Sequence, residues 1–385
     1  MLASRTFATA GDVHAPSSKS PPLSGIRVLE MGQLIAGPFA GQLLGLVKQL
    51  AIKSDVIIEN FKPGTLEKWS LAPADLHPHN PSLIFTRVSG YGQSGPWAPR
   101  PGYASVCEAE SGFRYINGFP DPVSGDLAGP PVRPNISLGD SVAGLHAAFG
   151  TVLALLGRQR NTSNGTTVDV SIVESMLNLM EGIIPEYDRK GKTRGPSGSS
   201  VTGIVPTNAY PCLPTSSSPA SASTPTYVVI GANGDSIYAR LMHAIGRQDL
   251  TGPSYAQNHH RVARQPEIEA AISEWTGQRS VEEVEEVMKG AGVPVGRVVS
   301  VREVVEGEQI RARGAVRDVW VDDAKGEGEG WNVKMQGTFP VIDGVDPQPR
   351  WAGPDLGSHT DEVLIHDLGL SSESVAHLRH EGIIG

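Results

Sequence analysis

Short β-prone runs alternate with a helix-forming segment near the start of the folded sequence. The runs lie at residues 26–31, 55–60 and 83–88, and residues 39–53 between the first two have the composition of a helix. Strands that alternate with helices pair mainly in parallel, because each helix carries the chain back to the same end of the sheet. The alternation therefore predicts an α/β protein with a mainly parallel sheet.

The rest of the chain continues this pattern, and its composition changes around Pro211. The low-complexity stretch 212–226 reads as a loop or insertion, and the segment after it indicates a separate, smaller domain. The further elements that the sequence predicts are helices at 140–158, 174–182, 235–245, 267–275, 281–289 and 371–380 and strands at 167–172 and 227–230.

Composition and charge argue against several classes of protein. The formal net charge is −9 and no basic block occurs, which argues against nucleic acid as a partner. No apolar run approaches the ~18–20 residues that cross a bilayer, so we expect no membrane-spanning segment. The two cysteines, Cys107 and Cys212, are too few for a disulfide framework or a zinc cluster, which fits a reducing compartment.

Residues 1–24 differ in composition from the rest of the chain. The stretch before Asp12 contains Arg5 and several Ser, Thr and Ala, and it has no acidic residue. This composition is typical of a mitochondrial transit peptide, and Arg5-Thr6-Phe7-Ala8 resembles a matrix-processing site. We therefore expect a transit peptide and linker over 1–24 and a mitochondrial location. The alternatives are a plain disordered tail and a cytoplasmic protein.

The common phosphate-binding and nucleophile motifs do not occur. Residues 32–41 after the first strand lack the G-x-G-x-x-G spacing of dinucleotide enzymes, and the sequence has no P-loop and no G-x-S-x-G motif. The pairs His77/His79 and His259/His260 lie in polar, loop-like sequence without nearby Cys or acidic clusters. We therefore predict no metal site.

Three stretches carry residue types that suit ligand binding or catalysis. Residues 59–64, ENFKPG, follow a strand and could hold an anion and a ring. Residues 89–96, SGYGQSGP, also follow a strand, and their three glycines permit close approach to a ligand or merely a tight loop. Asp140 directly precedes a predicted helix, where it is either an N-cap or a carboxylate nucleophile at the positive helix end.

Taken together, these motifs resemble those of the family III CoA-transferases, the group that includes formyl-CoA and carnitine CoA-transferases. The resemblance runs in order through GIRVLEMGQLIAGPFAGQLLG, SDVIIENFKPG, SGYGQSGP, Gly102-Tyr103, LGDSVAGLHAAFG, VDVSIVESMLN, GVPVGRV and LGSHTDEVL, from Gly25 to Leu364.

The resemblance implies an interlocked homodimer whose subunits each have a Rossmann-like large domain and a smaller α+β domain. We assign the large domain to 25–209, the small domain with its insertion 212–226 to 210–344, and a C-terminal return to the large domain to 345–385. The implied partners are an acyl-CoA, with succinyl-CoA as a candidate, and a small carboxylic acid. Coenzyme A takes part as a thioester substrate, and no permanently bound cofactor or metal is implied.

The resemblance also implies roles for single residues. Asp140 stands at the position of the family's catalytic Asp, which attacks the thioester, forms a mixed anhydride and then carries CoA as an aspartyl thioester. The turn Asn60-Phe61-Lys62 matches the family's CoA-contacting turn, and Lys68 stands where a relative places an Arg that pairs with CoA phosphate. Tyr103 matches a residue near the acyl group, and residues 231–234 correspond to a flexible glycine loop over the site.

The sequence departs from the family pattern at several points. Ile35 stands where formyl-CoA transferase has a Gln, which argues against formyl or oxalyl specificity. After Gly45 the chain lacks a strand like D-x-G-A-E-V-I-K-V-E and several tens of residues. We expect the loss of a central strand to leave sheet edges unpaired and to weaken both stability and CoA affinity. The missing segment leaves a catalytically silent isoform as one alternative. The other is an α-methylacyl-CoA racemase, a relative on the same fold, although racemases place a His at the position of Tyr103.

Overall fold

The computed structural model describes residues 22–31, 40–160, 164–214, 226–322, 330–345 and 352–384, with the backbone alone at 40–44. Most of the predicted leader 1–24, Ile35 and most of the insertion 212–226 lie outside the described residues. The chain forms two compact units: unit 1 comprises Met1–Val88, Ala147–Asp169 and Val301–Gly385, and unit 2 comprises Ser89–His146 and Val170–Ser300. The domain boundaries expected from the sequence group these segments differently and stay a prediction.

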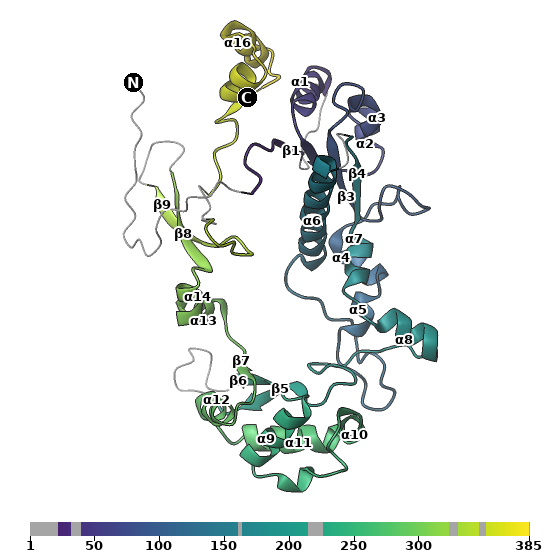
Figure 1. Cartoon of the computed structure of the whole chain (residues 1–385), viewed down its shortest axis with the longest axis vertical. Coiled ribbons are helices and arrows are strands. Elements are labelled where there is room, and N and C mark those ends of the chain that lie inside the picture. Colours follow the sequence, from purple (N-terminus) through teal and green to yellow (C-terminus); the bar gives the residue numbers. More distant parts are fainter. Residues whose placement is uncertain are drawn as a thin grey trace. The chain divides into compact units, whose positions relative to one another are not determined.

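Unit 1 contains a four-stranded sheet (Figure 1). Its strands lie in the order β1 (Val28–Met31), β2 (Val56–Glu59), β3 (Ile84–Ser89) and β4 (Thr167–Ser171). β1 pairs in parallel with β2 and β2 pairs in parallel with β3, so Val56 stands between Val28 and Ile84. The predicted α/β fold with a parallel sheet is confirmed.

Strands β2 and β3 are buried on both faces, as inner strands of a parallel sheet are. Successive side chains of a strand point to opposite faces. Ile57 and Phe85 pack on one face with Leu66, Leu71, Leu76 and Leu83 from the segment between β2 and β3. Val56 and Ile84 pack on the other face with Leu155 of helix α6 (Leu138–Arg160). The apolar strands predicted from the sequence therefore pack against a hydrophobic core on each face of the sheet.

The segment that the chain lacks after Gly45 does not open the middle of this sheet. Gly45 lies in α1 (Ala40–Ile52), which leads directly to β2, and β1 pairs with β2 without a gap. Among the described strands β1 is at the edge, and Val28 is 49% exposed. The expectation of an unpaired sheet edge agrees with this position of β1, although the parallel connection through α1 closes β1 directly on β2. The expected loss of stability and of CoA affinity stays a prediction.

The other elements of unit 1 are shorter or follow the sheet in sequence. A cluster of Leu46, Leu364 and Val375 holds the C-terminal helices against α1. These elements are α2 (Thr65–Lys68), α3 (Pro73–Leu76), α13 (Val301–Glu306), α14 (Glu308–Ala312), β8 (Val316–Val321), β9 (Trp331–Gln336), α15 (Thr360–Glu362), η2 (Val363–Asp367) and α16 (Ser372–His380).

Unit 2 has its own antiparallel sheet and its own core. The sheet has the order β5 (Thr207–Cys212), β6 (Thr226–Gly231), β7 (Val295–Arg297). Its core joins strand residues such as Tyr210 and Ile230 to helix residues such as Leu241, Ile272 and Val284. The helices of unit 2 are α4 (Ala104–Glu110), α5 (Phe113–Ile116), α7 (Ile172–Asn178), α8 (Ile183–Lys190), α9 (Asp235–Ala244), η1 (Gln248–Leu250), α10 (Asn258–Val262), α11 (Gln265–Thr276) and α12 (Val281–Gly290).

Among the described residues, α6 is the one helix that is long and apolar enough to cross a membrane by length and composition. No such segment was expected from the sequence. Polar contacts tie the second half of this helix to the sheet of unit 1: Thr151 Oγ1 lies 2.6 Å from Thr86 Oγ1 of β3, and Arg158 Nη2 donates to Asp55 Oδ1 at 2.8 Å. These contacts are typical of a helix that packs against a sheet in a globular unit.

Candidate active site

The turn Asn60-Phe61-Lys62 follows the carboxyl end of β2, where ligands of parallel sheets bind. Phe61 is 8% exposed, and its ring meets Trp69 edge-on at a centroid distance of 5.1 Å. Asn60 and Lys62 are exposed on either side of it. The buried ring therefore anchors the turn in the core. The side chains that can reach a ligand are the amide of Asn60 and the ammonium group of Lys62.

An ion cluster, buried at Arg87 and Glu59 and exposed at Glu67, lies next to this turn. Arg87 of β3 donates from Nε to Glu59 Oε1 at 2.6 Å and from Nη1 to Glu67 Oε1 at 2.8 Å. Glu59 also accepts the Phe61 N–H at Oε2, at 2.7 Å. Burial raises the pKa of the Glu59 carboxyl even though Arg87 opposes the shift, whereas hydrogen bonds from Arg87 lower the pKa of Glu67. Arg87 and Glu67 were not predicted from the sequence, because nothing in their local sequence marks them as partners.

Lys68 ends the short helix α2, which begins after Gly64 in the left-handed conformation at φ 88°. The side chains of Lys62 and Lys68 are both exposed, and among the described residues neither forms an ion pair. This short segment therefore carries two cations, and no carboxylate is bound to either of them. This end of the sheet is a candidate site for anionic groups such as phosphates.

Tyr103 and Asp140 both lie in unit 2, at the beginnings of α4 and α6. Tyr103 is 74% exposed, and it precedes the first turn of α4. Gly102 before it lies against another backbone, since a Cβ there would be 3.1 Å from Gly90 Cα. Gly139 before Asp140 is equally confined, because a Cβ there would be 3.1 Å from Ala104 Cβ. The two glycines allow the starts of α4 and α6 and the loop at Gly90 to pack closely.

Asp140 is the third residue of α6, because the helix begins two residues earlier than the sequence pattern indicated. Its carboxylate is exposed and takes part in none of the hydrogen bonds among the described residues, so the N-cap interpretation is wrong. The pKa of Asp140 is raised, first by burial of part of the side chain and then by the charge of Glu108. A carboxylate held without a partner in this way is suited to act as a nucleophile or a base.

The glycine-rich loop after β3 brings into unit 2 a polar aromatic cluster that was not predicted from the sequence. Tyr91 donates its hydroxyl to Glu110 Oε2 at 2.5 Å, which raises the pKa of Tyr91 to about 12. Arg100 donates to Glu110 Oε1 at 2.6 Å and lies over the ring of Trp97 at 4.7 Å. The tyrosine and arginine in this loop are a local sequence signal that could have indicated the cluster, but their common partner is contributed by α4.

The structure groups the predicted residues into two sets. Asn60, Phe61, Lys62 and Lys68 lie on one segment of unit 1, and Tyr103 and Asp140 lie at two neighbouring helix starts in unit 2. The turn 231–234, expected to be a flexible loop, is held by hydrogen bonds from Ala232 N to Pro206 O at 2.9 Å and from Arg261 Nη2 to Asn233 O at 2.6 Å.

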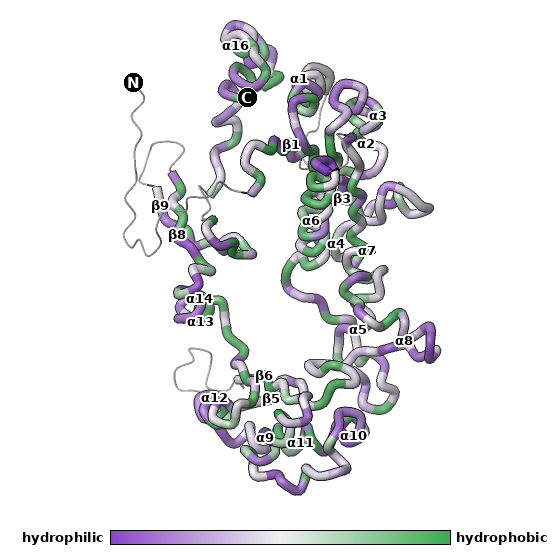
Figure 2. Tube along the Cα trace, in the orientation of Figure 1, coloured by the Kyte–Doolittle hydropathy of each residue, from purple (hydrophilic) through white to green (hydrophobic). Residues whose placement is uncertain are grey.

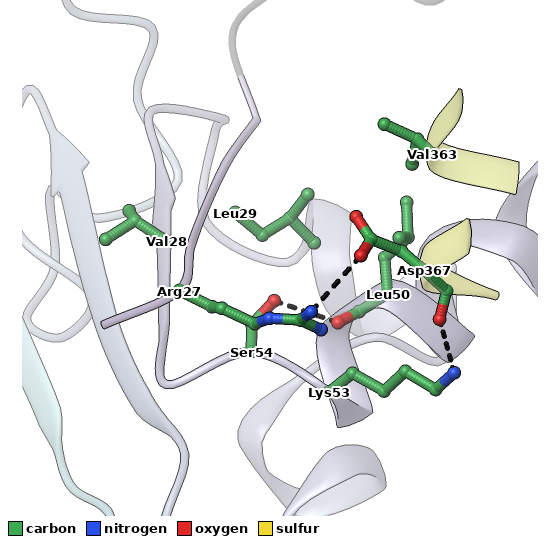
Figure 3. Close-up of a pocket in the computed structure, with 8 residues that line it drawn as sticks. All are labelled: Arg27, Val28, Leu29, Leu50, Lys53, Ser54, Val363 and Asp367. Atoms are coloured by element: carbon green, nitrogen blue, oxygen red, sulfur yellow. Dashed lines mark hydrogen bonds and ion pairs between the residues drawn. The ribbon is translucent and has the colours of Figure 1, made fainter. Parts of the chain in front are cut away.

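A cavity of about 260 Å³ in unit 1 lies elsewhere (Figure 3). It is lined by residues of β1, the end of α1 and η2, and none of the six predicted site residues takes part. Arg27 pairs with Asp367 at 3.1 Å, and Lys53 donates to the Asp367 carbonyl, so both cations at this cavity already have partners. No cluster of His, Cys, Asp and Glu that could hold a metal occurs within the described residues.

Comparisons with known proteins identify a family and several relatives that this chain resembles. A family model described as CoA-transferase family III matches residues 45–360. Succinyl-CoA–D-citramalate CoA-transferase of Chloroflexus aurantiacus is 35% identical over 425 residues, covering 96% of this chain and 100% of the relative. Human succinyl-CoA:glutarate CoA-transferase is 24% identical over 418 residues, covering 94% of this chain and 90% of the relative.

A solved structure of a CaiB/BaiF family protein from Brucella suis has the same fold, with a TM-score of 0.69, 22% identity, and coverage of 90% of this chain and 99% of that one. The alignment with the citramalate enzyme spans 425 positions, whereas 96% of 385 residues is about 370. About 55 positions of that relative therefore have no counterpart here. This difference agrees with the segment that the sequence lacks after Gly45.

Proposed function

Because the chain belongs to CoA-transferase family III, we propose that it uses Asp140 as the nucleophile that moves coenzyme A from an acyl-CoA to a free carboxylic acid. The observation that supports the proposal is that the Asp140 side chain is accessible and has no hydrogen-bond partner within the described residues. Its carboxylate is exposed in the first turn of α6, accepts no hydrogen bond within the described part of the chain, and has a raised pKa. Each of these properties leaves its electron pair available for attack.

The transfer proceeds through two covalent states of Asp140. The carboxylate attacks the thioester carbonyl, the C–S bond breaks, and a mixed anhydride forms as CoA thiolate leaves. The thiolate then attacks the aspartyl carbonyl, which releases the donor acid and leaves CoA on Asp140 as a thioester. The acceptor carboxylate repeats these steps in reverse and regenerates the Asp140 carboxylate. Water must be excluded throughout, since it would hydrolyse the anhydride.

We propose that Asn60, Lys62 and Lys68 contact coenzyme A and that Tyr103 lies near the acyl group. The exposed lysines are placed on one segment and lack carboxylate partners among the described residues, which supports a role in binding phosphates. Phe61 contributes by anchoring the turn, because its ring is buried against Trp69. Coenzyme A is then a substrate, and the proposal requires no resident cofactor.

We propose succinyl-CoA as the donor and a small dicarboxylic or hydroxydicarboxylic acid as the acceptor. The names of the relatives support this choice, since they describe transfer from succinyl-CoA to citramalate, malate or glutarate. We also propose a mitochondrial location on the composition of residues 1–24.

The experiment that tests the proposed function is a panel of carboxylic acids incubated with succinyl-CoA and the full chain. We expect mass spectrometry to detect a new acyl-CoA with at least one small dicarboxylic acid and free succinate in equal amount. Exchange of the α-hydrogen of a methylacyl-CoA with solvent, without any transfer, would identify a racemase instead. Absence of both transfer and CoA binding in a folded sample would identify a silent isoform.

We further propose that two copies of the chain form an interlocked homodimer through α6. This helix exposes Phe149, Val152, Leu153 and Leu156, which are 65%, 44%, 50% and 41% exposed. Their spacing of three and four residues places them on one face of the helix. Figure 2 shows the apolar residues along α6. A helix face of this kind supports a protein interface, because water contact with large apolar side chains is unfavourable.

Phe149→Glu is expected to weaken self-association, since a charge would have to be buried in an apolar interface. We expect the dissociation constant, measured by analytical ultracentrifugation, to rise about tenfold or more. Gln309→Glu adds the same charge at an exposed position of α14 in the same unit and should leave the dissociation constant unchanged. A wild-type chain that sediments as a monomer, or equal affinity in both variants, would contradict an interface on this face.

A further inference from the structure

A second carboxylate, that of Glu108, lies near Asp140 and takes no part in the steps above. It is fully buried on α4. Arg114 of α5 donates to Glu108 Oε2 from Nε at 2.8 Å and from Nη2 at 2.5 Å. The other oxygen, Oε1, accepts the backbone N–H of Gly139 at 3.3 Å. One carboxylate therefore joins α4, α5 and the first turn of α6.

We propose that Glu108 is a positioning residue for the Asp140 nucleophile, because it holds the turn that carries Asp140 and keeps a negative charge beside it. The inference rests on the proposed function of Asp140. Gly139 immediately precedes Asp140, and a Cβ on it would be 3.1 Å from Ala104 Cβ and 3.2 Å from Ile172 Cγ2. The backbone at this point is thus packed against α4 and α7, and the hydrogen bond from Gly139 to Glu108 sets the direction in which the next side chain leaves the helix.

The charge of Glu108 acts on the reactivity of Asp140. Repulsion between the two carboxylates adds to burial in raising the pKa of Asp140. The repulsion falls as Asp140 attacks the thioester, because its negative charge passes first to the thioester carbonyl oxygen and then, when the C–S bond breaks, to the CoA sulfur. Destabilising the free carboxylate more than the transition state lowers the barrier of the attack.

Arg114 offsets part of this charge, and no other cation among the described residues acts on Asp140. On α4, the Cys107 thiol has its pKa raised to about 11 by burial and by the charges of Glu110 and Asp140, so it is uncharged near neutral pH. Arg114 of α5 is bound to Glu108, and no cation shifts the pKa of Asp140 among the described residues. α7 approaches this turn through the apolar Ile172, and its carboxylate Glu174 is exposed.

The test compares Glu108→Gln with Glu174→Gln, which removes an exposed carboxylate from α7. Glutamine at 108 keeps the size of the side chain and an oxygen for the Gly139 N–H but removes the charge. We expect the single-turnover rate of CoA loading onto Asp140, followed by intact-protein mass, to fall about three- to tenfold. The acid limb of its pH profile should move to lower pH, because Asp140 then loses its proton at lower pH. Glu174→Gln, the control, should change neither the loading rate nor the position of the acid limb.

Two further variants keep the inference testable. Glu108→Ala should show the same shift of the acid limb and a lower plateau, since it also loses the acceptor for Gly139. If Glu108→Gln does not fold, Arg114→Gln leaves the buried Glu108 side chain without its cation, so Glu108 should take up a proton and the acid limb should move down as in Glu108→Gln. An unmoved limb in a folded variant would overturn the inference. Failure of the proposed function itself would be a different result, namely CoA loading that persists in Asp140→Ala.

Discussion

Asp140→Ala is expected to lower the rate of CoA transfer by about 10⁴-fold or more, because it removes the group that attacks the thioester. The side chain is exposed and accepts no hydrogen bond within the described residues, so its loss should leave the fold unchanged. The rate is measured as transfer from succinyl-CoA to the best acid of the panel. Intact-protein mass should show a CoA adduct on the wild type and none on the variant.

Asp188→Ala provides the matched control. Asp188 is an exposed carboxylate on α8 in the same unit, and its replacement should leave the transfer rate and the adduct unchanged. Asp140→Asn adds a variant of nearly equal size. If either Asp140 variant still accumulates the adduct, or keeps more than about a tenth of the rate, another residue carries the coenzyme.

Arg87→Met is expected to lower the free energy of unfolding by about 3–5 kcal/mol, because it leaves the buried Glu59 carboxylate without its cation. The side chains of Arg87 and Glu59 are 6% and 0% exposed, so solvent cannot replace the lost partner. Urea unfolding followed by circular dichroism measures the loss. The double variant Arg87→Met/Glu59→Met should recover much of it, since the uncompensated charge is then gone.

The loss in Arg87→Met should also depend on pH. Burial already raises the pKa of Glu59 in the folded protein, and without Arg87 the pKa should rise further. A folded-state pKa above the unfolded value means that the variant is most stable at low pH, where Glu59 is protonated in both states. Its stability should then fall as the pH rises through the folded-state pKa.

Arg379→Met tests whether the large loss of stability expected in Arg87→Met is caused by the burial of the ion pair. Arg379 pairs with Asp361 at 2.5 Å in the same unit, but the two side chains are 44% and 55% exposed. Its replacement should therefore cost far less stability than that of Arg87, because solvent screens an exposed ion pair. Equal losses in the two variants would show that the Arg87 cluster behaves as a surface ion pair, and a smaller loss for Arg87→Met at high pH than at low pH would contradict the proposed charge on Glu59.

The local sequence pattern predicted several elements closely, because each depends on neighbouring residues. The helices expected at 235–245 and 281–289 are α9 (Asp235–Ala244) and α12 (Val281–Gly290). α12 begins with a capping box at Ser280 and Glu283, a signal contained within four consecutive residues. The start of α6 was less accurate, because its first residues are held by contacts with α4 rather than by a local cap.

The sequence by itself determined the α/β class and brought Asp140 and the turn Asn60-Phe61-Lys62 to attention, since periodicity and motif spacing are properties of adjacent residues. Only the tertiary structure decided which charges meet. Arg87 pairs with Glu59 across 28 residues, and Gly139 donates to Glu108 across 31. Such pairs form because parallel strands align their carboxyl ends and because glycine lets the starts of helices pack closely. The sequence cannot reveal them, because a charged residue in a strand or helix gives no local sign of its partner.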